Sequence, residues 1–230
     1  MRRMSKSLRK RCWVALAASA LIYGCAQEPY VKPRPIVPPK RVPAIGTTSE
    51  IVQTEGASYL VLNKSKDAAW KRMIESLRRA DFAIEALDQK TGRAVLRYNG
   101  DPGSYIDCGR VVQTVKTEQG DKKYDFPAAQ AYMQYEMASH GKIYQVDRKM
   151  ALDARITVSF VEVDSATTRV SAQGAYAVTR DQSAFAQDEK ALSFTDTINF
   201  KSSESAAFPN AATRCQATGK LEYALLSGLR

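Results

Sequence analysis

The sequence predicts an α+β domain: an antiparallel sheet of about six strands, with an early helix and a C-terminal helix packed on one face. Three observations support this prediction. Apolar and polar residues alternate in several short runs between residues 58 and 200, a period typical of half-buried strands. One segment near the start of this region, and another at the end of the chain, carry apolar residues at helical spacing instead.

The chain begins with a segment typical of an export signal. Six arginines and lysines, with no acidic residue among them, precede an apolar stretch of ten residues from Trp13 to Ile22. A membrane-spanning helix needs about 20 apolar residues, so a cleaved signal is favoured over a permanent anchor.

The residues that follow, Ile22-Tyr23-Gly24-Cys25, resemble the lipobox of bacterial lipoproteins. The resemblance implies that residues 1–24 are removed and that Cys25 becomes the lipidated N-terminus, which anchors the protein to a membrane. Tyr23 departs from the family pattern, in which this position is usually small. Ala26 is not the aspartate that often retains lipoproteins at the inner membrane, which favours the outer membrane, with the domain facing the periplasm.

Residues 25–48 are expected to form a flexible stalk behind the lipidated cysteine. Six of the nine prolines of the chain lie between residues 29 and 43. Proline excludes helix and central strand and favours an extended chain of about 3.1 Å per residue, so twenty residues reach roughly 60 Å. We interpret the stalk as a spacer; the alternative is a proline motif that binds a partner groove. The single folded domain then covers residues 49–230.

The folded region is expected to open with a strand at residues 58–63 and a helix that runs from an N-cap at Ser65 to near residue 80. Trp70, Met73, Ile74 and Leu77 form the apolar stripe of this helix. Residues 82–86 and 94–98 alternate around a turn at 88–92, which predicts a hairpin.

Four further strands and one helix complete the predicted domain. The strands are expected at residues 105–115, 155–163, 169–179 and 191–200, with the turn at 164–167 closing a hairpin. A closing helix is expected from about Thr218, with an apolar stripe that includes Leu221 and Leu225.

A lipidated cysteine, a proline-rich stalk and a β-α-β-β unit whose helix carries Trp70 resemble the helix-grip domains of the C subunit of the outer-membrane β-barrel assembly machinery. The helix-and-hairpin pattern, which continues through Asp81-Phe82-Ala83-Ile84-Glu85, covers about 45 residues. The later strands and the final helix match only in order, and that subunit carries two such domains where this chain has room for one. A role in outer-membrane protein assembly is therefore implied by likeness of fold alone, which does not fix function.

Cys108 and Cys215 are the two cysteines of the folded region, because Cys12 lies in the signal and Cys25 at its end. Exported compartments permit disulfides, so a Cys108–Cys215 bridge is predicted, with two separate buried thiols as the alternative. Cys108 is expected to share a strand face with Ile106 and Val112.

The positive charge does not indicate a nucleic-acid-binding domain. The formal net charge is +10, but residues 1–24 contribute six of these charges and residues 26–48 three, which leaves the folded region near +1. Phosphate binding requires basic residues clustered on the domain itself, so no nucleic-acid partner is expected.

The sequence offers little for catalysis, for metal binding or for a cofactor. His140 is the only histidine, and neither a Gly-x-Ser-x-Gly elbow nor a phosphate-binding loop is present. Asp101 and Asp107 would suit an acid/base pair, but Asp101-Pro102-Gly103 is more typical of a turn capped by its aspartate. We therefore predict a protein that is not an enzyme and that needs neither a metal nor a cofactor.

Residues 124–144 are rich in aromatic side chains and poor in charge. Tyr124, Phe126, Tyr132, Tyr135 and Tyr144 form a candidate partner surface, because such side chains are enriched at interfaces. The alternative is an extra helix over residues 128–139 that packs them into the core.

Two functions remain. One is a binding or scaffold module, anchored to the membrane by its lipid and serving an envelope protein partner. The other is a carrier that holds a lipid or another apolar ligand between helix and sheet. An internal apolar cavity would favour the carrier, and a packed core with exposed apolar side chains the scaffold.

Overall fold

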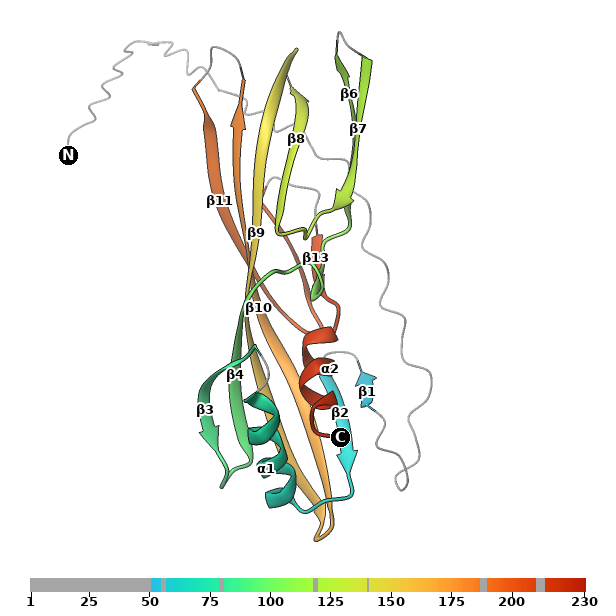
Figure 1. The fold of residues 1–230 in the computed structure, drawn as a ribbon, viewed down its shortest axis with the longest axis vertical. Helices are drawn as coiled ribbons and strands as arrows, with labels where there is room; N and C mark the ends of the chain where they lie inside the picture. The colour runs from blue at the N-terminus through green and yellow to red at the C-terminus, as the bar shows by residue number, and fades with distance from the viewer. Residues whose placement is uncertain are drawn as a thin grey trace, which may run out of the picture.

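Two very long strands run through the whole of the folded region. The computed structural model describes residues 51–54, 57–78, 81–117, 120–139, 141–186, 190–209 and 214–230, so Cys25, the stalk and His140 lie outside the described residues. β9 (Lys142–Asp164) and β10 (Thr167–Phe185) pair antiparallel along all of β10 (Figure 1). Twenty-three residues at about 3.3 Å each give β9 a length of about 75 Å. The predicted turn at 164–167 is confirmed, but both strands extend far beyond 155–163 and 169–179.

The remaining elements flank this long hairpin. In chain order they are β1 (Ile51–Thr54), β2 (Ala57–Leu62), α1 (Lys66–Leu77), β3 (Ala83–Asp88), β4 (Arg93–Gly100), β5 (Ile106–Asp107), β6 (Arg110–Thr117), β7 (Gly120–Pro127), β8 (Tyr132–Ser139), β11 (Leu192–Lys201), β12 (Ser205–Ala207), β13 (Arg214–Ala217) and α2 (Lys220–Ser227).

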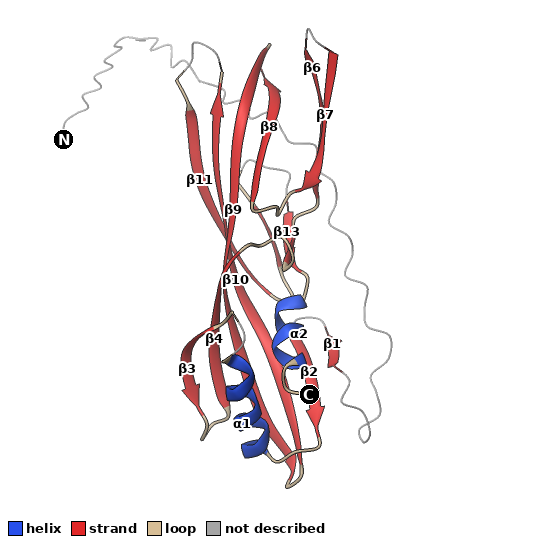
Figure 2. Cartoon of the chain, viewed as in Figure 1, coloured by secondary structure: helices blue, strands red, loops and turns tan. Residues whose placement is uncertain are grey.

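One half of the molecule, which we call the helix half, contains both helices. Its strands lie in the order β1-β2-β10-β9-β4-β3, and all neighbouring pairs are antiparallel. α1 packs on β9 and β10, and α2 on β10 and β2, so both helices cover the same sheet face (Figure 2). The rings of Trp70 and Phe160 meet edge to face with their centroids 5.3 Å apart. Ser65 caps α1 by accepting a 3.4 Å hydrogen bond from the backbone N–H of Ala68, as predicted.

The other half, the strand half, contains no helix among its described residues. β11 pairs with the end of β10 and β8 with the start of β9. The β6–β7 hairpin lies beside β8, and β12, β13 and β5 form a small separate sheet. The predicted sheet of about six strands is therefore too small: the main sheet has eight strands, with sheets of three and two strands beside it. The α+β arrangement with an early and a C-terminal helix is confirmed.

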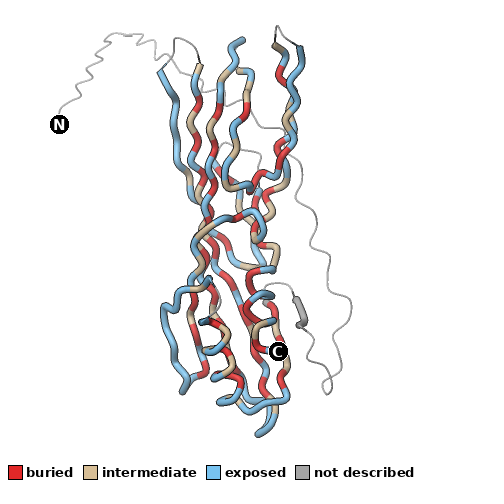
Figure 3. Tube along the Cα trace, viewed as in Figure 1, coloured by how far each residue is buried: buried red, intermediate tan, exposed pale blue. Residues whose placement is uncertain are grey.

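The long hairpin buries one face along most of its length (Figure 3). Every even-numbered residue of β9 from Val146 to Phe160, and of β10 from Thr168 to Ala184, is buried. The odd-numbered residues of the same stretches are exposed or half-buried. Because side chains alternate strictly between the two faces of a strand, one continuous core joins the helix half to the strand half.

The predicted strand at 105–115 is broken at one glycine. Gly109 has φ of 77°, a left-handed conformation that suits glycine, and it separates β5 from β6. Ile106 and Cys108 are buried before the break, whereas Val111 and Val115 are buried after it. Val112 is exposed, so the prediction that it shares a face with Cys108 is wrong, because the glycine shifts the alternation by one residue.

The alternative helix at 128–139 is also wrong. Residues 132–139 form β8, which pairs with β9 from Tyr132 opposite Lys149 to Ser139 opposite Lys142. Met133, Tyr135 and Met137 lie on the inner face, so this segment follows the period of a strand despite its helix-favouring composition.

Candidate functional site

The predicted disulfide is confirmed, and it joins β13 to the segment between β5 and β6. Cys108 lies between β5 and β6 and Cys215 in β13, with sulfur atoms 1.99 Å apart. Both residues are buried. β13 pairs with β5 through Gln216 and Asp107 and through Ala217 and Ile106, so the bridge reinforces an existing strand pair.

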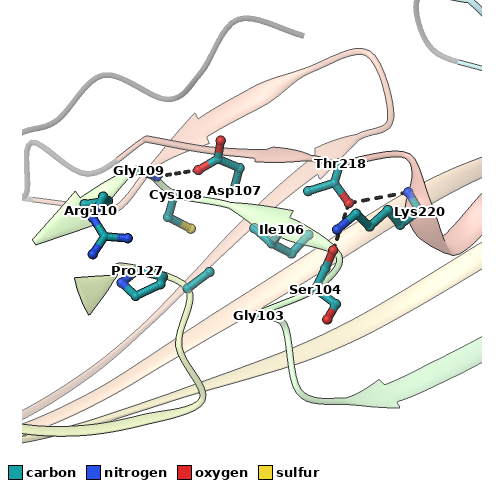
Figure 4. A pocket seen from close by; sticks show the side chains of 11 residues that line it. Gly103, Ser104, Ile106, Asp107, Cys108, Gly109, Arg110, Pro127, Thr218 and Lys220 are labelled. Carbon is teal, nitrogen blue, oxygen red and sulfur yellow. Dashed lines mark hydrogen bonds between the residues drawn. The ribbon is translucent and has the colours of Figure 1, made fainter. Parts of the chain in front are cut away.

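A hollow of about 290 Å³ lies beside this disulfide (Figure 4). It is bordered by the loop around β5, the end of β7 and the start of α2. Its lining residues are Gly103, Ser104, Ile106, Asp107, Cys108, Gly109, Arg110, Pro127, Ala129, Thr218 and Lys220. The charged side chains among them are one carboxylate, one guanidinium and one ammonium group.

Most polar groups of the hollow are committed to neighbouring backbone or side chains. Arg110 Nε donates a 2.7 Å hydrogen bond to Asp125 Oδ1, and the backbone N–H of Gly109 donates a 2.8 Å bond to Asp107 Oδ1. Thr218 Oγ1 donates to Ser104 O at 3.1 Å. The carboxylate of Asp107 and the hydroxyl of Thr218 thus hold the backbone around β5, on either side of the strand.

Asp101 and Asp107 both serve their own turns. Asp101 Oδ1 accepts a 2.7 Å hydrogen bond from the backbone N–H of Gly103, as the turn interpretation predicts. Asp107 makes the same kind of contact two residues further, with Gly109. The two carboxylates therefore hold the loop that leads into the disulfide.

Tyr176 and Glu222 form a buried polar contact that the sequence reasoning missed. Tyr176 Oη donates a 2.5 Å hydrogen bond to Glu222 Oε1, and Ser202 Oγ lies 2.7 Å from the same oxygen. Burial and the charge of Glu222 raise the pKa of Tyr176 well above its ordinary value. A glutamate set among Leu221, Leu225 and Leu226 was the available signal in the sequence. The contact links α2 to β10.

Arg180 is a second buried polar group, on the inner face of the strand half. Its Nη2 donates a 2.8 Å hydrogen bond to Asp196 Oδ2 across the β10–β11 pair. Its guanidinium carbon lies 5.0 Å from the ring centre of Phe194 and 4.6 Å from that of Phe208. These contacts fix the side chains that point inward from β11.

The aromatic residues of 124–144 do not form one exposed surface. Phe126 and Tyr135 are buried and lie against each other with ring centroids 5.3 Å apart. Tyr124 and Tyr144 are half-buried, and Tyr132 alone of the five is exposed. The buried members pack the β6–β7 hairpin onto β8, so they are not available to a partner.

Four of the exposed large apolar side chains lie near the two ends of the long hairpin. At the strand-half end, Ile143 and Phe185 lie on the odd-numbered face and are 41% and 44% exposed; we call this pair the distal patch. Phe185 is opposite Gln145, so Ile143 is its diagonal neighbour at roughly 7 to 8 Å. At the other end, Val161 and Val163 are 48% and 52% exposed and form what we call the turn patch.

The described residues contain no group of three or more His, Cys, Asp or Glu side chains that could hold a metal ion. None of the described helices is both long and apolar enough to cross a membrane. Comparison with protein-family models, with curated protein sequences and with solved structures finds no match to this chain.

Proposed function

We propose that this chain is a lipoprotein of the bacterial envelope, anchored through Cys25, that acts as a binding or scaffold module. The observation that carries the proposal is the arrangement of the distal patch and the turn patch at opposite ends of one continuous hairpin about 75 Å long. Exposed apolar side chains grouped on a folded domain are typical of sites that contact other proteins.

The cellular location belongs to the same proposal. The Ile22-Tyr23-Gly24-Cys25 segment and Ala26 favour an outer-membrane lipoprotein whose domain faces the periplasm. The Cys108–Cys215 disulfide supports an oxidising compartment of this kind, because disulfides rarely persist in the cytosol.

The packing of α1 favours the binding module over the carrier. Trp70, Met73 and Leu77 are all buried under α1, and Trp70 contacts Phe160 of the sheet directly. Large side chains thus occupy the interface between this helix and the sheet, where a helix-grip carrier would hold its apolar ligand.

A role in outer-membrane protein assembly is the narrower form of the proposal. It is supported by the resemblance of the β2-α1-β3-β4 segment to helix-grip domains, which concerns fold and not activity.

The proposal is tested by capturing partners from membranes with the full-length chain. Reversible cross-linking and purification of the native chain should recover an envelope protein that is identified by mass. The variant Ile143→Ser/Phe185→Ser should recover that protein at least about tenfold less, because ΔΔG of 1.4 kcal/mol already changes affinity tenfold.

The variant Val161→Ser/Val163→Ser tests the turn patch in the same way, and the proteins that it fails to recover are compared with those lost by the distal variant. It removes a similar amount of exposed apolar surface at the other end of the same hairpin, and the melting temperatures of the two variants show whether both remain folded. Equal recovery by the native chain and the distal variant would exclude the distal patch as the binding site.

A further inference from the structure

β11 presents one open edge of the main sheet. Among the described strands it pairs with β10 alone. The backbone N–H of Ser202 donates to Gly174 O at 3.0 Å, so the even-numbered residues of β11 face β10 in the hydrogen-bonded pairs. The N–H and C=O groups of Ser193, Thr195, Thr197 and Asn199 therefore point to the open side.

Lys201 confirms this alternation at the end of the strand. Its outward N–H donates to Glu204 Oε2 at 3.1 Å, and its outward C=O accepts a 2.9 Å bond from the backbone N–H of Glu204. The outward groups of β11 are therefore satisfied at Lys201, while no described residue provides such a partner to the four outward positions before it.

The other edges of the main sheet are protected, and β11 is not. β3 carries a bulge between Ile84 and Ala86. β8 has its Glu136 carbonyl occupied by the side chain of Gln113, and β1 is only four residues long. β11 has ten residues without a register shift or a proline, and its first lysine is Lys201. Bulges, lysines, prolines and covered edges are the usual means by which proteins prevent edge-to-edge pairing.

We propose that β11 pairs antiparallel with β11 of a second copy of this chain, about a two-fold axis at Ser193. In this register Leu192 lies opposite Phe194 of the second copy. Lys190 lies opposite its Asp196, whose carboxylate also accepts a hydrogen bond from Arg180 of its own chain. Leu192 and Phe194 are 49% and 42% exposed in the single chain. The pairing would therefore cover apolar side chains and match opposite charges at the same time.

The backbone alternation suits this register. Ser193 with Ser193, and Ala191 with Thr195 on each side, would form hydrogen-bonded pairs, giving as many as about six backbone hydrogen bonds. Leu192 and Phe194 then fall in the non-hydrogen-bonded pairs, whose Cα atoms are closest at about 4.5 Å. A two-fold axis at Thr195 would instead set Phe194 against Asp196, so the Ser193 register is favoured.

This inference is independent of the proposed function, because it concerns the strand edge and not the distal patch or the lipid. It is tested with the full-length chain carrying Ser193→Cys, treated with a short thiol-to-thiol cross-linker in whichever cell fraction contains it. A product of twice the chain mass that contains only this protein is expected. The native chain is the background control: Cys108 and Cys215 are bridged, and any product formed through Cys12 or Cys25 appears in it equally. Only product beyond this background counts as evidence for the pairing.

Thr197→Cys is the position control. In the proposed register two copies of residue 197 lie eight residue positions apart along the strands, or roughly 27 Å, so no product is expected. Equal products from Ser193→Cys and Thr197→Cys would overturn the register. A product that joins this chain to a different protein would overturn the proposal of a second copy.

Two further variants examine the backbone and the charge. Thr195→Pro in the Ser193→Cys chain removes an outward N–H and keeps the hydrogen bonds between β11 and β10, so the cross-linked product should fall at least about tenfold. Thr195→Val in the same chain keeps the outward N–H and should retain the product. Lys190→Glu leaves the strand untouched and places like charges opposite each other, so it should also reduce the product. An undiminished product in both Thr195→Pro and Lys190→Glu would overturn strand pairing as its cause.

Discussion

Tyr176 donates a 2.5 Å hydrogen bond to Glu222, and this contact joins the centre of β10 to the first turn of α2. Both side chains are buried, and Ser202 Oγ lies 2.7 Å from the same carboxylate oxygen. α2 is thus held to the sheet by a polar contact as well as by its leucines.

Removing the acceptor should destabilise the protein. Glu222→Ala leaves the buried Tyr176 hydroxyl without its partner, and we expect a loss of about 1 to 3 kcal/mol in the free energy of unfolding, measured by chemical denaturation. Glu222→Gln keeps an oxygen at the same position and should lose less than half as much. Equal losses in the two variants would show that the acceptor oxygen is not what stabilises α2.

The raised pKa of Tyr176 predicts a loss of stability in alkali. Burial and the neighbouring Glu222 keep the folded-state pKa of this hydroxyl above that of the unfolded chain, which is about 10. The stabilisation is complete below pH 10 and decreases as the pH rises above it, by up to about 1.4 kcal/mol per pH unit from this group. Tyr176→Phe should show a shallower decrease between pH 9 and 11. Parallel curves for the two proteins would contradict this assignment.

Gly174 is expected to tolerate no side chain. A Cβ atom there would lie 2.5 Å from Cε2 of Tyr176, so Gly174→Ala must displace the ring and break its bond to Glu222. We expect a loss of about 2 kcal/mol or more. Gly100→Ala is the matched control: its Cβ would lie 2.9 Å from the Tyr98 hydroxyl, but that ring is half-buried and its hydroxyl donates to the backbone carbonyl of Asp101, not to a buried carboxylate. Similar melting temperatures for both variants would contradict the argument.

The disulfide should contribute substantially to stability. It closes a loop of 107 residues, for which chain entropy gives roughly 4 to 5 kcal/mol, with smaller values common in practice. Replacing both Cys108 and Cys215 by Ser should lower the melting temperature, and peptide mapping without reduction should find the two peptides joined in the native chain. Free thiols at both positions in protein isolated from cells without reducing agent would refute the bridge.

Lipid attachment at Cys25 is tested by fractionation. We expect Cys25→Ser to release a soluble form or to leave the signal uncleaved, because this change removes the thiol that we propose to carry the lipid. The native chain in the same strain is the control. A cleaved Cys25→Ser protein that stays with the membranes would mean that another segment is the anchor.

The sequence predicted well those elements whose periodicity is local and undisturbed. Trp70, Met73 and Leu77 define the buried stripe of α1, and Ser65 its N-cap. The turn at 164–167 and the alternation on both sides of it define the β9–β10 hairpin. What the local pattern missed was its length, because a buried Arg148 and a buried Arg180 interrupt the apolar alternation in the strand half.

The wrong predictions for residues 128–139 and for Val112 also have physical causes. The composition of 128–139 favours helix, but pairing with β9 and burial of Tyr135 outweigh that preference. Gly109 shifts the alternation of buried and exposed residues by one position. This shift cannot be predicted from alternation alone, because it depends on the φ angle of Gly109. The open edge of β11 was beyond sequence reasoning altogether, since a strand sequence does not reveal which side of it lacks a neighbour.

The unbroken hairpin of β9 and β10 also has a mechanical consequence. A bend between the two halves would have to strain two strands and the ladder between them at once, and no loop interrupts either strand where the helices end. A pull along the hairpin would load its hydrogen bonds together in shear. The hairpin is therefore expected to resist both bending and extension, and partners bound at its two ends would be held at a constant separation.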